Sequence, residues 1–334
     1  MRYESGERYE ILYDLPRGEY SDTGVGGIRT RTIRAGEALE VECFPIVRVD
    51  HEAKREKRMR ASSPAQEKLN LANARKRVRR LLEANFVPGD IALHLTFAYP
   101  AADPGMVNLR QAREQWVKDG LPECEDDARR HIRNYISRVK RAIRRAGEDP
   151  KGLKYLYVIE GSREAGPDSA NTLPPKFHFH AVIHAPGLSR EALEELWPFG
   201  FANADRLSFQ HDGLKPLADY ITKQRRFSRR WAHSKNLKEP EVRVSDRKIS
   251  RRRAALVAED VRQYGRQIFE KVYPGYQCVE EPCVRYSDFV AGAYIFARLR
   301  LRHPSGVAAT RGDTFGSRAL VEPAALPQQR RARR

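Results

Sequence analysis

The segment Phe177-His178-Phe179-His180-Ala181-Val182-Ile183-His184 decides how the rest of the chain is interpreted. Successive side chains of a β-strand point to opposite faces, so the phenylalanines, the alanine and the isoleucine share one face and the histidines share the other. On such a strand His178 and His180 project side by side, at a spacing that lets both ring nitrogens reach one ion. Without further support, a half-buried strand whose histidines face solvent is the simpler interpretation.

A tyrosine and a lysine further along the chain supply that support. Pro216 stands where proline favours a helix start, and the residues that follow are predicted to be helical, so Tyr220 and Lys223 share one helix face. A divalent ion could polarise a phosphodiester while the tyrosine oxygen attacks phosphorus and the lysine supplies positive charge. Position 224 is a glutamine, which predicts a single-tyrosine enzyme. For Lys223 taken alone, an ordinary exposed lysine is the alternative.

Together these motifs resemble those of the HUH (His-hydrophobe-His) endonucleases, and most of all the rolling-circle replication initiators and replication-associated proteins of phages, plasmids and bacterial elements. His178-Phe179-His180 matches the metal motif, Tyr220-Ile221-Thr222-Lys223 matches the Tyr-x-x-Lys motif, and Leu93-His94-Leu95-Thr96-Phe97 stands for a first, weaker strand motif. Segments 70–90 and 234–240 also look similar, so the resemblance covers about residues 68–260. It implies an RRM-like palm and a 5′-phosphotyrosine intermediate.

Glu160 is the expected third metal ligand. Two neutral imidazoles hold Mg²⁺ or Mn²⁺ poorly because these ions prefer oxygen donors, so a carboxylate on an adjacent strand is expected. Glu160 ends the strand predicted over residues 153–159, and in related proteins an acidic or polar residue near this place has that role. A surface glutamate at a strand end is the alternative for Glu160, and Glu164 or His184 could replace it as the ligand.

The pattern of elements between residues 91 and 224 predicts an α+β fold. Alternation and apolar periodicity give the order strand, helix, strand, strand, helix, strand, helix, over residues 91–99, 126–146, 153–159, 177–184, 190–197, 201–209 and 218–224. This order suits an RRM-like (ferredoxin-like) antiparallel-sheet palm with helices on one face.

Around that palm we expect four further parts. They are an N-terminal accessory segment at residues 1–50, a basic helix at 51–88, a basic helical C-terminal subdomain at 233–302 and a disordered basic tail at 303–334, with the palm at 89–232. The C-terminal subdomain is inferred from helices predicted over 249–272 and 286–302. The disordered tail is inferred from its high content of Pro, Ala and Arg.

The charge of the chain favours a polyanionic partner. A formal net charge of +18 and a sequence pI near 9.9 exceed what solubility needs and are typical of nucleic-acid binding. Basic residues mixed with aromatics suit a groove for a single strand. The residues expected to contact nucleic acid are His94, Thr96, Arg225, Arg226, Arg229, Arg230 and Trp231.

The sequence thus predicts a metal-dependent, single-tyrosine DNA nicking and strand-transfer endonuclease that initiates rolling-circle replication on single-stranded DNA or an origin hairpin. No Walker-type motif occurs, so a host helicase is an expected partner. No membrane is expected, because no apolar run is long enough to span one, and the absence of a signal-peptide pattern favours the cytoplasm. The alternatives are a non-catalytic RRM-like binder of single-stranded nucleic acid, or a relaxase or transposase of the same superfamily.

Overall fold

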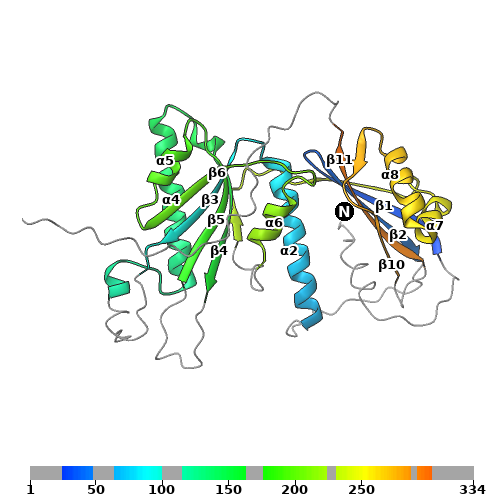
Figure 1. The fold of residues 1–334 in the computed structure, drawn as a ribbon, viewed down its shortest axis with the longest axis horizontal. Helices are drawn as coiled ribbons and strands as arrows, with labels where there is room; N and C mark the ends of the chain where they lie inside the picture. The colour runs from blue at the N-terminus through cyan, green and yellow to red at the C-terminus, as the bar shows by residue number, and fades with distance from the viewer. Residues whose placement is uncertain are drawn as a thin grey trace, which may run out of the picture. The chain divides into compact units, whose positions relative to one another are not determined.

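The chain forms an α+β fold with two antiparallel sheets in a computed structural model (Figure 1), which describes residues 25–47, 64–99, 115–162, 176–223, 231–286 and 292–302. The main helices are α2 (Pro64–Asn85), α4 (Glu125–Arg145), α5 (Arg190–Glu195), α6 (Lys215–Ile221), α7 (Arg251–Glu259) and α8 (Arg266–Val272). The expected tail at 303–334 lies outside the described residues, as do Glu164 and the arginines expected at positions 225, 226, 229 and 230.

The five-stranded sheet, here called the histidine sheet, has the strand order β6-β3-β5-β4-β7. Its strands are β3 (Ile91–Phe97), β4 (Lys154–Ser162), β5 (Lys176–His184), β6 (Gly200–Arg206) and β7 (Trp231–His233). Helix α4 joins β3 to β4 and α5 joins β5 to β6, which confirms the predicted order of strands and helices. Because β5 is antiparallel to both β3 and β4, the strand carrying the histidines is at the centre of the sheet.

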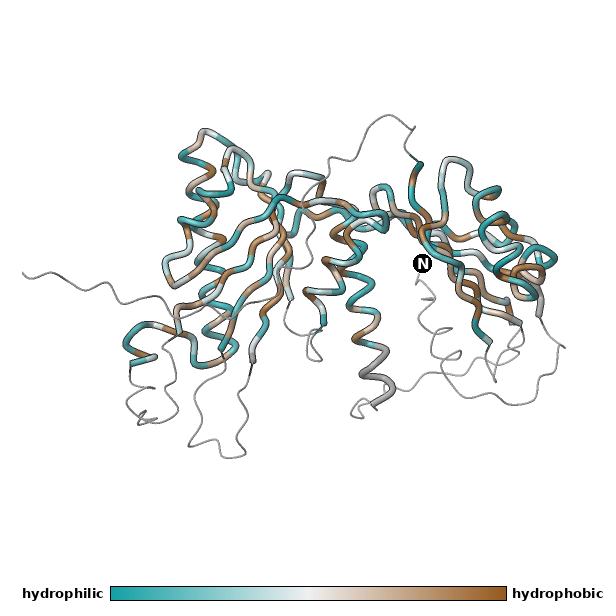
Figure 2. The backbone as a smooth tube through the Cα atoms, in the orientation of Figure 1, coloured by the Kyte–Doolittle hydropathy of each residue, from teal (hydrophilic) through white to brown (hydrophobic). Residues whose placement is uncertain are grey.

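One face of the histidine sheet packs against α4 and α5, as Figure 1 shows. Helix α4 presents one apolar stripe, which includes Ile132, Tyr135 and Val139, and its other faces are charged; Figure 2 shows the resulting alternation of hydrophilic and hydrophobic residues along the helices. On the sheet side the buried partners include Leu95 and Phe179. Full burial of each such side chain contributes about 1.5–3 kcal/mol.

The opposite face of the histidine sheet is not left open, contrary to the expectation of helices on one face only. Helices α2 and α6 pack there, with Leu81 and Ile221 in a cluster that also contains Val158 and Val182 of the sheet. The physical reason is that these sheet residues are apolar, so exposing them to water would be unfavourable. The candidate site lies on this same face.

The second sheet, here called the terminal sheet, combines strands from both ends of the described chain. Its path is β10-β11-β2-β1-β8, with β9 also paired to β11; the strands are β1 (Val25–Ala35), β2 (Ala38–Val47), β8 (Glu241–Ser245), β9 (Tyr276–Cys278), β10 (Cys283–Tyr286) and β11 (Ala293–Leu301). Helices α7 and α8 cover one face. Strand β2 is therefore interior to this sheet, and residues 25–47 of the expected N-terminal accessory segment form two of its strands.

The helix predicted over 286–302 is wrong, because Tyr286 ends β10 and residues 293–301 form β11. In β11, Ile295, Ala297 and Leu299 are buried on the helix-covered face, and the residues between them point the other way, which is the two-residue period of a strand. The C-terminal part thus contains strands as well as helices. The single helix predicted over 249–272 is divided into α7, a short π-helix at Val261–Gly265 and α8.

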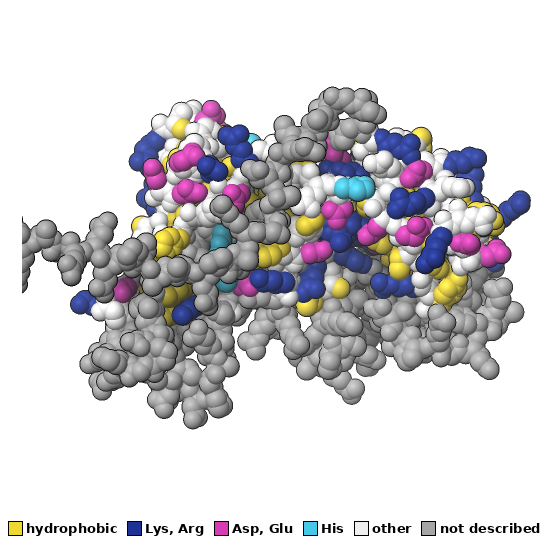
Figure 3. All heavy atoms as spheres, in the orientation of Figure 1, with side chains coloured by type: hydrophobic (Ala, Val, Ile, Leu, Met, Phe, Trp, Pro, Cys, Tyr) yellow, Lys and Arg dark blue, Asp and Glu magenta, His cyan; other side chains and the backbone are white. Residues whose placement is uncertain are grey.

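Ion pairs join α2 to the terminal sheet. Arg80 lies 2.6 Å from Glu40 of β2, and Arg79 pairs with the same carboxylate. Burial alone would raise the pKa of Glu40, but the two guanidinium groups hold it at about 2. Figure 3 shows Lys and Arg side chains spread over the visible face among Asp and Glu.

Candidate functional site

Strand β5 places its histidines as the alternation predicts. Phe177, Phe179 and Ala181 are buried in the core beneath α4, and His178 and His180 therefore point to the other face. The side chain of His178 is 26% exposed and that of His180 is 7% exposed. The pair thus lies at the margin of the apolar cover, with one imidazole accessible and one enclosed.

Glu160 of β4 lies directly opposite His178 in the strand pairing. Its Oε2 atom is 3.2 Å from Nε2 of His178 and 3.1 Å from Nε2 of His180. Burial would raise the pKa of Glu160, but hydrogen bonds from both imidazoles hold it well below its ordinary value. The carboxylate is therefore ionised and shared between the two histidines, at the place where we expected the third ligand.

His94 of β3, expected only to contact nucleic acid, completes the group. It lies opposite His180, and the two rings stack with centroids 4.6 Å apart and planes 4° apart. Burial, with the neighbouring His180 and His178, lowers the pKa of His94 to about 4, so this ring is neutral at physiological pH. Its buried Nε2 atom has no hydrogen-bond partner, which costs free energy unless a ligand binds there.

Three imidazole nitrogens lie close enough together that they could hold a divalent cation. His94, His178 and His180 each offer a nitrogen, and these atoms lie within 4.8 Å of one another. Ligand atoms about 2.1 Å from an octahedral ion, at right angles to each other, are separated by about 3.0 Å, close to the distances between Glu160 and the imidazoles of His178 and His180. The histidine cluster, defined as His94, His178 and His180, could therefore hold a metal ion, and Glu160 lies within reach as an oxygen donor.

Tyr220 and Lys223 lie beside the histidine cluster. Tyr220 is near the end of α6, and its ring is 5.2 Å from the ring of His180 in an edge-on arrangement. Lys223 follows the last helical residue by two positions, so the two residues do not share a helix face as expected. The chain bend nevertheless brings the Lys223 ammonium 4.6 Å from the centroid of the Tyr220 ring and 3.6 Å from Oε1 of Glu160.

Helix α2 holds both ends of α6. Before the first turn, Glu83 accepts a hydrogen bond of 2.5 Å from the backbone nitrogen of Leu214. After the last turn, Arg75 donates to the carbonyl oxygens of Thr222 at 2.9 Å and Lys223 at 3.1 Å. These contacts satisfy backbone groups that a short helix leaves unpaired, and they fix the position of Tyr220 relative to the histidine cluster.

The other predicted residues have different environments. Thr96 of β3 lies opposite His178 and Phe201, next to the histidine cluster. Trp231 of β7 packs against the apolar cluster between the sheet and α2 and stacks on His233. His184, which we considered as a substitute ligand, is at the other end of β5, where its Nδ1 atom lies 2.7 Å from Asp90.

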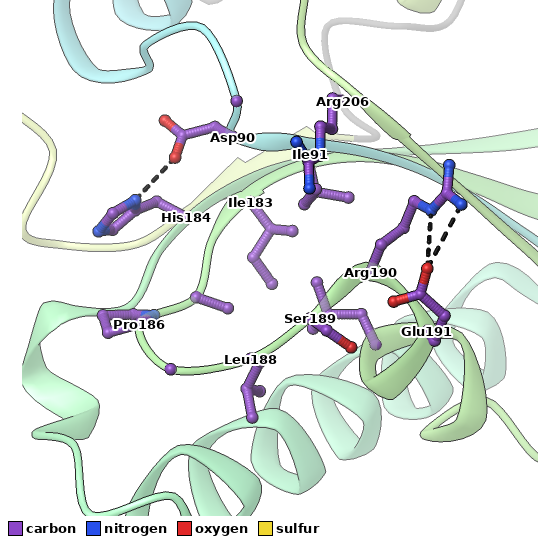
Figure 4. Close-up of a pocket in the computed structure, with 14 residues that line it drawn as sticks. Asp90, Ile91, Ile183, His184, Pro186, Leu188, Ser189, Arg190, Glu191 and Arg206 are labelled. Atoms are coloured by element: carbon purple, nitrogen blue, oxygen red, sulfur yellow. Dashed lines mark hydrogen bonds and ion pairs between the residues drawn. The ribbon is translucent and has the colours of Figure 1, made fainter.

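Figure 4 shows the surroundings of that His184–Asp90 pair. A pocket of about 560 Å³ lies between the first residues of β3 and the loop that leads from β5 to α5, and it is lined in part by Ile91, Ile183 and Leu193. None of the residues of the histidine cluster lines it. The pocket and the histidine cluster therefore occupy opposite ends of the same strands.

Comparison of the chain with protein-family models, with curated proteins and with solved structures finds no match. Within the described ranges, no helix combines the length and the apolar character that crossing a bilayer requires.

Proposed function

We propose that the protein is a metal-dependent, single-tyrosine endonuclease and strand transferase of the HUH type, acting on single-stranded DNA. The observation that carries this proposal is the convergence of a phenol, an ammonium group, a carboxylate and three imidazoles. The Tyr220 ring lies 5.2 Å from the histidine cluster, and Lys223 contacts both the Tyr220 ring and Glu160. The β-α-β-β-α-β order with β5 and β3 central supports the RRM-like palm that such enzymes use.

The residues have separate roles in the proposed reaction. His94, His178, His180 and Glu160 would hold Mn²⁺ or Mg²⁺, which when bound polarises the scissile phosphate. Three imidazoles and one carboxylate favour Mn²⁺ of the two, because Mg²⁺ prefers an all-oxygen environment. The oxygen of Tyr220 forms a bond to phosphorus as the bond to the 3′-oxygen breaks, and the phenol proton passes in net terms to that leaving oxygen.

Lys223 would neutralise negative charge on the phosphate during this displacement. The products are a 5′-phosphotyrosine and a free 3′-hydroxyl group. Attack of a 3′-hydroxyl on the phosphotyrosine reverses the reaction, so strand transfer needs no nucleotide cofactor. Rolling-circle initiation on an origin hairpin, together with a host helicase, is the biological role we propose, and a relaxase or transposase would use the same chemistry.

The test is to incubate the protein with Mn²⁺ and a labelled pool of random-sequence single-stranded DNA and to look for a covalent adduct that survives denaturation. We expect a phosphotyrosyl peptide containing Tyr220, and no adduct for Tyr220→Phe, with cleavage lowered by on the order of 10³-fold or more. Tyr286→Phe is the matched control, because Tyr286 is also partly exposed but lies on β10. Binding without any adduct in the wild-type protein would leave only the non-catalytic RRM-like binder.

A further inference from the structure

Phe201 of β6 is an exposed aromatic residue that the reaction described above does not use. It is 75% exposed, and no other large hydrophobic side chain among the described residues is more exposed. A single exposed apolar residue is common on protein surfaces, so exposure alone assigns no role. The position of Phe201 relative to the histidine cluster is what distinguishes it.

The strand pairing places Phe201 in one row with the candidate site. Phe201 lies opposite Thr96, Thr96 opposite His178, and His178 opposite Glu160. Directly opposed residues of antiparallel strands project from the same face. Ala204, three residues after Phe201, is buried on the other face, which α4 and α5 cover, as the alternation of a strand requires.

The row has the spacing of a short piece of nucleic acid. Neighbouring strands are about 4.8 Å apart, so Phe201, two strands from His178, lies about 10 Å from it along the row. A stacked single strand advances about 3.4 Å per nucleotide and an extended one more, so about three nucleotides or fewer span this distance. A single strand that runs along this row from a phosphate at the histidine cluster would therefore place a base above β6.

We propose that Phe201 is a stacking platform for a nucleobase of the single strand whose phosphate lies at the histidine cluster. This inference rests on the proposed function, since it requires a phosphodiester at the cluster. An aromatic ring accepts the face of any base, so the contact holds the strand without reading its sequence. Phe201 thereby fixes the path of the strand across β6, β3 and β5.

The test measures binding rather than cleavage. In the Tyr220→Phe protein with Mn²⁺ present, where no cleavage is expected, we compare an oligothymidylate with an abasic oligodeoxynucleotide of the same length. Phe201→Ala should weaken oligothymidylate binding about tenfold, as loss of one stacked base predicts, and should leave abasic binding unchanged. Phe201→Trp should restore the affinity. The new tryptophan adds fluorescence to that of the three native tryptophans, and oligothymidylate should quench this additional fluorescence. Val244→Ala is the control, because Val244 is 53% exposed on β8.

Equal oligothymidylate affinity for Phe201→Ala and its parent, or an equal loss for the abasic strand, would overturn the platform. Unchanged emission of Phe201→Trp would do the same. These failures differ from failure of the proposed function. If the platform alone is wrong, the wild-type protein still forms the Tyr220 adduct. If the nicking activity alone is wrong, base-dependent binding at Phe201 persists while no adduct forms.

Discussion

Strand β5 carries histidines at both of its ends, and the two ends differ in how their polar atoms are satisfied. At the far end, both oxygens of Asp90 have a partner. The Nδ1 atom of His184 lies 2.7 Å from one oxygen, and the backbone nitrogen of Val87 donates a hydrogen bond of 2.9 Å to the other. At the near end, one oxygen of Glu160 is shared by two imidazoles, and the Nε2 atom of His94 has no partner.

This difference indicates which end of β5 is the better candidate for a ligand site. The His184–Asp90 pair is complete without an added group, even though it borders a pocket. The histidine cluster offers more donor atoms than its own contacts satisfy, and buried polar atoms of this kind are costly unless a ligand binds. The converging imidazoles and the unsatisfied Nε2 atom of His94 therefore support the proposed function more than the presence of a cavity does.

The largest expected effect separates the two ends directly. His180→Ala should abolish Mn²⁺ binding, with affinity lowered more than about 100-fold, since it removes a ligand rather than an outer partner, and nicking should disappear with it. His184→Ala should leave both within about twofold. Calorimetric titration with Mn²⁺ measures the affinities. Equal loss in the two variants would show that the comparison between the ends is mistaken.

A smaller effect is expected for the two carboxylates. Glu160→Gln removes the charge that faces the imidazoles, so we expect Mn²⁺ affinity to fall by about 10- to 100-fold. Asp90→Asn is the matched change at the other end; it should leave Mn²⁺ affinity unchanged and cost about 1 kcal/mol of unfolding free energy. The two variants are compared by Mn²⁺ titration and by urea denaturation. Unchanged Mn²⁺ affinity in Glu160→Gln would exclude Glu160 as a ligand.

Part of this site could be predicted from local sequence alone. Alternation within one strand is a local property, so it placed His178 and His180 on one face, and the strand that ends at Glu160 placed the carboxylate nearby. The face on which His94 lies could be predicted in the same way, because Leu93, Leu95 and Phe97 alternate with it and are buried on the opposite face of β3. Its partnership with His180 depends on the register between β3 and β5, and a shift of two residues would have separated the rings.

The terminal sheet was missed for a related reason. Residues 293–301 contain Ala, Leu and Arg, which are strong helix formers, and their state as a strand depends on pairing with β2, more than 240 residues earlier in the chain. Pairing between distant segments is not encoded in the local periodicity of either one. The placement of Lys223 beyond the end of α6 likewise depends on Arg75 of α2, which is distant in sequence.

The smallest expected effect concerns pH. The pKa of His94 falls from 6.5 to about 4 on folding, chiefly because the ring is buried, so between these pH values the unfolded chain binds a proton there that the folded chain does not. Stability of the metal-free protein should therefore be full above pH 6.5 and decline as the pH falls toward 4. In His94→Phe, which keeps an aromatic ring without a titrating nitrogen, the decline in melting temperature should be shallower by on the order of a few degrees. If melting temperature depended on pH identically in His94→Phe and the wild-type protein, His94 would bind its proton as strongly in the folded chain as in the unfolded chain. The contrast between the unsatisfied histidine cluster and the complete His184–Asp90 pair would then lose its electrostatic basis.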